Sequence, residues 1–85
     1  MSKSSDFDVE CCNAANQFVS LPFAFIGADE ARRLSDEIRA GDVRNAMDLL
    51  RDDMATHFDC GNIIKHDRED EVYRMLVRIA LRCSV

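Results

Sequence analysis

The histidines and cysteines are the residues with the greatest capacity for chemistry. His57, Cys60 and His66 are separated by only two and five residues. Imidazole and thiolate are the ligands that zinc prefers in proteins. The spacing contains no paired C-x2-C knuckle, so it matches no standard zinc pattern. We therefore expect no metal and no other cofactor, and we interpret His57 as an interfacial side chain paired with Asp53 one helical turn earlier.

The remaining thiols give little support for catalysis. Cys11 and Cys12 are adjacent, and we interpret both as small, buried or half-buried side chains. Cys60 with His57 or His66 is the local candidate for a nucleophile and its base. The aspartates around that pair make its setting acidic, which disfavours a reactive thiolate. We expect no enzyme activity, and a redox or metal role of Cys11, Cys12, Cys60 and Cys83 stays open.

Two charged segments near the C-terminus are candidate binding surfaces. Arg74, Arg78 and Arg82 recur at four-residue spacing and would share one face of a helix. Guanidinium groups bind phosphate and carboxylate with a fixed fork, so this stripe could contact a nucleic acid or an acidic groove. The acidic residues 67–71 precede the stripe and would occupy the first turn of the same helix, where they suit the helix dipole. We interpret them as helix charge and not as a mimic of nucleic-acid phosphates.

The composition is that of an acidic globular protein. Apolar residues make up 47% and charged residues 32% of the 85 positions. The net charge of −5 disfavours a nucleic-acid coat or a binder of anionic membranes, because both need positive charge. The longest apolar run is too short to span a bilayer, and the N-terminus lacks the apolar region of a secretory signal. We expect a cytoplasmic protein without membrane contact, whose cysteines stay reduced.

Residues 42–61 carry the clearest helical pattern and would form the centre of the fold. Asp42 is the expected N-cap and Gly61 the expected end, because Gly accepts a positive φ. The apolar stripe of this helix is Val43, Ala46, Met47, Leu50, Met54 and Phe58. Residues 28–40 predict a second helix that ends at Gly41. The short joint between the two helices favours a helical hairpin.

Weaker patterns predict two further helices. The first would begin at Ser5 or Asp6 after a frayed tail of residues 1–4, and would end near Val19 because Pro22 follows. Its expected apolar stripe is Val9, Cys12, Ala15 (or Asn16) and Val19. The last helix would begin at Asp67 after a loop of residues 62–66, in which Ile63 and Ile64 would reach the core. Its expected stripe is Val72, Met75, Leu76, Ile79 and Cys83.

The connector of residues 20–27 is apolar and lacks a clear helical face. Phe23, Phe25 and Ile26 follow Pro22, and Phe18 precedes it. One interpretation is a lid over the core. The other is an exposed patch for self-association or for a partner, because large apolar side chains on a small protein's surface mark an interface. We take Phe18, Phe23, Phe25 and Ile26 as candidate partner-binding residues, together with Arg74, Arg78 and Arg82.

These observations predict one all-α domain over residues 1–85, a small four-helix, bundle-like fold with a central helical hairpin. The expected function is non-catalytic protein binding, by a small acidic inhibitor or adaptor that forms a homodimer or binds a larger bacterial protein. The basic residues are mostly Arg, a bias typical of a bacterium or of its phage or plasmid. The first alternative is a nucleic-acid binder that uses the Arg stripe, and the second is a Cys/His metal module. The sequence contains no Gly-rich phosphate loop and no nucleotide fingerprint, so we expect no small-molecule substrate.

Overall fold

The computed structural model describes the backbone of residues 2–61 and 63–83 and the side chains of residues 6–61 and 67–82. This part of the chain consists of four helices and contains no strand. The helices are α1 (Ser2–Val19), α2 (Ala28–Arg39), α3 (Arg44–Asp59) and α4 (Ile63–Cys83). The predicted all-α, four-helix fold is confirmed.

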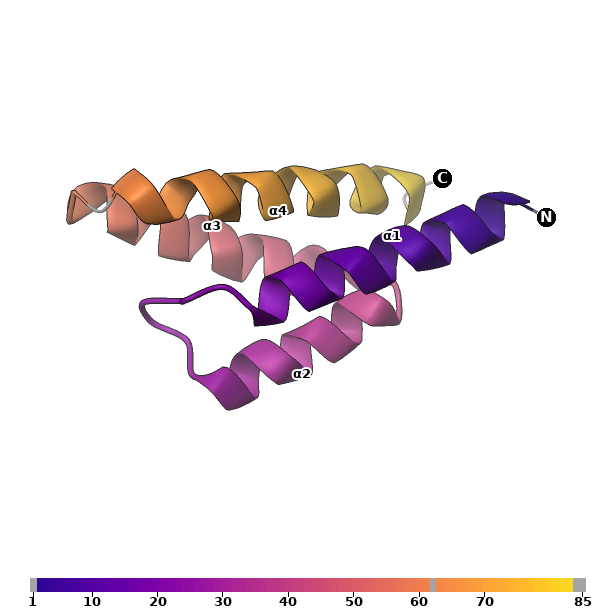
Figure 1. Ribbon diagram of the computed structural model, residues 1–85, viewed down its shortest axis with the longest axis horizontal. Helices are drawn as coiled ribbons and strands as arrows, with labels where there is room; N and C mark the ends of the chain where they lie inside the picture. Colours follow the sequence, from indigo (N-terminus) through magenta and orange to yellow (C-terminus); the bar gives the residue numbers. More distant parts are fainter. Residues whose placement is uncertain (1, 62, 84–85) are drawn as a thin grey trace.

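The helices form two antiparallel pairs that lie one on the other (Figure 1). α1 packs most extensively on α2, and α3 packs most extensively on α4. The two pairs meet mainly through α1 and α4, while α2 and α3, which the short joint connects, share a smaller contact. The molecule is elongated, 45 × 22 × 18 Å. The connector of residues 20–27 and the turn between α3 and α4 lie at one end of the long axis.

The buried face of α1 differs from the predicted stripe by about a quarter turn. Cys11, Ala15 and Phe18 are buried, whereas Val9 and Val19 are exposed. Two apolar stripes with helical spacing compete on this helix, and the structure buries the one that contains Phe18. A buried phenylalanine removes more apolar area from water than a valine does, so this choice is the more stabilising one. α1 also begins at Ser2, which places most of the predicted tail within the helix.

Glycines with positive φ end two of the helices, as the sequence predicts. Gly41 follows α2 with a φ of 100°, and Gly61 follows α3 with a φ of 80°. The prediction that Asp42 caps α3 is wrong, because Val43 holds the N-cap position and no side-chain hydrogen bond caps the helix. Val43 is instead buried in the core.

The stripe of α3 changes character along its length. Val43, Ala46 and Leu50 are buried as predicted. The next two buried positions are Asp53 and His57, and the predicted Phe58 is 73% exposed. A spacing of three or four residues continues the same face through polar residues, so the end of α3 brings ionisable groups into the interior.

α4 begins at Ile63, so the predicted loop of residues 62–66 is helical from Ile63 onward. Residues Val72, Leu76 and Ile79 form its buried stripe, as expected. The predictions for the side chains of Ile63, Ile64 and Cys83 lie outside the described residues. The acidic residues after Asp67 therefore lie beyond the first turn of α4 and not within it. None of the helices in the described part is long and apolar enough to cross a membrane.

Candidate functional site

Three ionisable side chains meet in the interior between α3 and α4. They are Asp53 and His57 from α3 and Glu69 from α4, and we refer to them as the buried triad. Each side chain is at most 3% exposed. Burying charged groups is costly unless they are paired or bind a metal, so the triad is the most demanding feature of this core.

The triad is compact and centred on the imidazole. Nε2 of His57 lies 3.1 Å from Oδ2 of Asp53 and 3.7 Å from Oε1 of Glu69. The three ligand atoms all lie within 4.8 Å of one another. The predicted pairing of His57 with Asp53 one turn earlier is therefore confirmed. One oxygen or nitrogen from each side chain thus lies close to the other two, an arrangement that can hold a proton or a cation.

Asp53 also holds the connector between α1 and α2. Its Oδ1 accepts hydrogen bonds from the backbone N–H groups of Ala24 (3.1 Å) and Phe25 (3.2 Å). Hydrogen bonds to a charged acceptor each contribute roughly 1.5–3 kcal/mol. A single carboxylate thus links α3, the connector and the imidazole of His57. This link determines where the connector crosses the end of the bundle.

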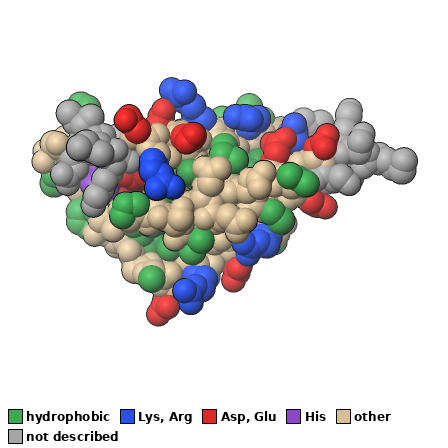
Figure 2. All heavy atoms as spheres, in the orientation of Figure 1, with side chains coloured by type: hydrophobic (Ala, Val, Ile, Leu, Met, Phe, Trp, Pro, Cys, Tyr) green, Lys and Arg blue, Asp and Glu red, His purple; other side chains and the backbone are tan. Residues whose placement is uncertain are grey.

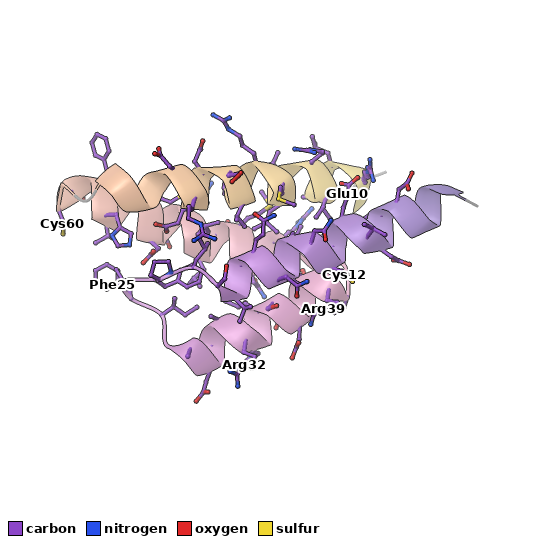
Figure 3. All side chains as sticks on the ribbon, in the orientation of Figure 1. Glu10, Cys12, Phe25, Arg32, Arg39 and Cys60 are labelled. Carbon is purple, nitrogen blue, oxygen red and sulfur yellow. The ribbon has the colours of Figure 1, made fainter. Side chains whose placement is uncertain are left out.

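A small pocket lies beside this anchor, and we call it the Phe25 pocket. Its volume is about 140 Å³. It is lined by Phe25, Ile26, Leu49, Asp52, Asp53 and Thr56. Phe25 is 70% exposed, and Figure 3 shows its ring projecting from the connector at the end of the molecule. The connector therefore presents an aromatic ring next to a hollow with a mainly apolar lining.

The structure divides the predicted aromatic patch into a buried part and an exposed part. The placement of Phe18 in a surface patch is wrong, because Phe18 is fully buried. Phe23 is half-buried and its ring packs on that of Phe18, with the centroids 4.9 Å apart. Ile26 is half-buried and Phe25 is exposed, and these two line the pocket. Part of the connector therefore covers the core, as the lid interpretation predicts, and part of it faces solvent. Its use by a partner stays a prediction.

The predicted Arg stripe is largely tied into ion pairs with acidic residues. Arg74 lies 3.0 Å from Asp70 on the same helix, and Arg82 lies 2.7 Å from Glu10 on α1. Arg78 is exposed between them. Figure 2 shows basic and acidic side chains interspersed over the visible face of the molecule. Paired charges of this kind produce a weak external field, which disfavours a phosphate-binding surface.

The predicted grouping of Cys60 with His57 does not form a shared site. Cys60 is exposed at the end of α3 (Figure 3), whereas His57 is buried between two carboxylates. Cys11 is buried, as expected, whereas Cys12 is exposed, so the expectation of a buried or half-buried Cys12 is wrong. The side chains of His66 and Cys83 lie outside the described residues.

Sequence reasoning missed Glu69 as a member of the site. Its position among several acidic residues is typical of a solvated helix face, yet Glu69 is 1% exposed. One signal was present, because Glu69, Val72, Leu76 and Ile79 share helical spacing, which extends the apolar stripe of α4 back to this carboxylate.

Comparison of the chain with protein-family models, with curated proteins and with solved structures finds no match. The function must therefore be argued from the geometry of the buried triad and of the Phe25 pocket.

Proposed function

We propose that the chain is a non-catalytic protein-binding module, a small inhibitor or adaptor of a larger protein. The proposed location is the cytoplasm of a bacterium. The chain would be encoded by that bacterium or by its phage or plasmid. The observation that carries this proposal is the exposure of Phe25 beside a pocket. An aromatic ring held over a concave apolar surface is typical of a binding hot spot. The two hydrogen bonds to Asp53 pre-organise the connector, which lowers the entropic cost of binding.

The lining of the pocket indicates the chemistry of the partner. Ile26 and Leu49 supply apolar surface, and Asp52 places a carboxylate among the lining residues. The net charge of the chain is −5. A partner surface that combines an apolar side chain with neighbouring Lys or Arg residues would complement both features. In the absence of such a partner, we propose that two copies of the chain pair through the exposed Phe25.

The burial of His57 supports a non-catalytic role. A general base must come within hydrogen-bond reach of the proton that it removes. The side chain of His57 is 2% exposed and lies between Asp53 and Glu69, so a bound substrate would not reach it. The exposed thiol of Cys60 does not share this environment.

The experiment is the substitution Phe25→Asp, followed by determination of the solution mass and by affinity capture from the native host. We expect the wild-type protein to be a dimer and the variant a folded monomer. Capture of a specific host protein should also be lost, because truncating a hot-spot aromatic residue costs about 2 kcal/mol or more, roughly a 30-fold weaker Kd.

Phe58→Asp is the matched control, because Phe58 is equally exposed but does not line the pocket. This variant should retain the dimer and the captured partner. Leu81→Asp tests a second surface, a groove of about 370 Å³ between α3 and α4 that Leu81 helps to line. Loss of binding in Leu81→Asp with retention in Phe25→Asp would move the docking surface to that groove and refute the proposal.

A further inference from the structure

We propose that the buried triad is a site for a divalent transition-metal ion, with Zn²⁺ as the representative ion. The ligands would be Oδ2 of Asp53, Nε2 of His57 and Oε1 of Glu69. This site differs from the Cys/His grouping expected from the sequence, since it contains no thiol and draws two ligands from α3 and one from α4. The inference is independent of the proposed docking function.

The spacing of the three atoms suits a coordination shell. At zinc–ligand distances of about 2.1 Å, neighbouring ligand atoms of a tetrahedral or octahedral shell lie about 3.0–3.4 Å apart. The separations of 3.1 Å and 3.7 Å from His57 are close to this range. The third pair lies within 4.8 Å, so a small shift of the Glu69 carboxylate toward Asp53 would complete the set.

The chemistry of the contact between Asp53 and His57 also calls for a positive centre. Oδ2 of Asp53 is buried and directed at Nε2 of His57, yet it accepts no hydrogen bond within the described part of the chain. An oxygen and a nitrogen that both present lone pairs repel each other at 3.1 Å unless a proton or a cation lies between them. A position beside two carboxylates and an imidazole nitrogen suits a divalent cation of borderline softness.

The backbone of the connector holds the carboxylate of Asp53 in place. The two backbone N–H groups of Ala24 and Phe25 occupy Oδ1 of Asp53 and leave Oδ2 directed toward His57. Such outer contacts orient metal ligands and strengthen binding. A mixed nitrogen and oxygen set without thiolate favours ions such as Zn²⁺ over Mg²⁺, which prefers oxygen ligands in an octahedral shell.

The test uses a full-length variant in which Cys12, Cys60 and Cys83 are replaced by Ser, so that these thiols cannot bind zinc. After treatment with a chelator, calorimetry should show one Zn²⁺ bound per chain. A zinc concentration about 100 times the Kd should raise Tm by roughly 10–20 °C. The same concentration of Mg²⁺ should leave Tm unchanged.

His57→Gln and Glu69→Gln in this background should each weaken zinc binding at least about tenfold, since each removes a ligand. Asp52→Asn is the matched control and should bind zinc as the parent does, because its side chain is exposed and outside the triad. Replacement of zinc by Co²⁺ in the parent adds a measurement that does not depend on the folding of these variants. Its absorption spectrum should show metal-centred bands without sulfur charge transfer.

Absence of stoichiometric zinc uptake by the cysteine-substituted parent would overturn the proposal, and so would sulfur charge transfer in the Co²⁺ spectrum. Unchanged zinc affinity in a folded His57→Gln variant would overturn it as well. The first of these results would mean that protons alone occupy the space between the three side chains.

Discussion

The carboxylate of Asp53 links the connector to the buried end of α3. Its two oxygens contact the backbone of the connector on one side and His57 on the other. Asp52, one position earlier, has an exposed side chain. Adjacent residues of the same type thus have opposite roles, because one faces the interior of the bundle and the other faces solvent.

This contrast predicts a large difference between two alanine substitutions. Asp53→Ala should lower the free energy of unfolding by about 3–5 kcal/mol, because it leaves two amide donors without their acceptor and removes the carboxylate that lies 3.1 Å from a buried imidazole. Asp52→Ala should change it by no more than about 0.5 kcal/mol. Urea unfolding in the presence of a chelator measures both values. Equal effects would show that Asp53 does not anchor the connector.

The phenylalanines provide a second comparison at the same scale. Phe18→Ala should cost about 3–5 kcal/mol, because it creates a cavity under the connector and removes the ring contact with Phe23. Phe58→Ala should cost about 0.5 kcal/mol or less, since that ring is mostly exposed. Thermal unfolding followed by circular dichroism distinguishes the two. A small effect of Phe18→Ala would contradict the burial of this ring and support the surface role that the sequence indicated.

At the scale of the helices, glycine termination signals explain why two helix ends could be predicted from the sequence. Gly41 and Gly61 have positive φ where the sequence predicts the ends of helices, so α2 and the end of α3 could be placed from local chemistry. The face of α1 could not be placed from spacing alone, because both of its apolar stripes have helical spacing and the larger side chain of Phe18 decides between them. The burial of Glu69 was indicated only by its helical spacing with Val72, and its contact with His57, which is distant in the sequence, could not be predicted from local chemistry.

The backbone geometry of two glycines predicts opposite effects of one substitution. Gly41→Ser should destabilise the protein by about 1–2 kcal/mol, because a side chain is strained at a φ of 100°. Gly27→Ser should stabilise it by about 0.5–1 kcal/mol. Gly27 is the N-cap of α2 in an extended conformation, without a side-chain cap and with open space around it, so the hydroxyl can accept an orphan N–H. Both changes are measured as shifts in Tm, and a stabilising Gly41→Ser would contradict the assignment of that turn.

At the scale of the whole molecule, charge pairing opposes a role in nucleic-acid binding. Arg82 joins α4 to Glu10 of α1, and Arg74 pairs with Asp70, so two of the three stripe residues face carboxylates. We expect no binding of duplex DNA in fluorescence anisotropy at low salt, where electrostatic attraction is strongest. Binding that weakens steeply with added salt, and that is lost in Arg78→Ala, would support the Arg stripe instead.

The ion pair between Arg82 and Glu10 has a practical consequence. It joins the middle of α1 to the end of α4. The two termini lie at one end of the long axis, whereas the connector with Phe25 lies at the opposite end (Figure 1). A fluorophore, an affinity tag or a carrier domain attached at either end of the chain would therefore point away from the aromatic tip. Immobilised on a sensor chip through either extremity, the molecule would stand with that tip facing the flowing sample.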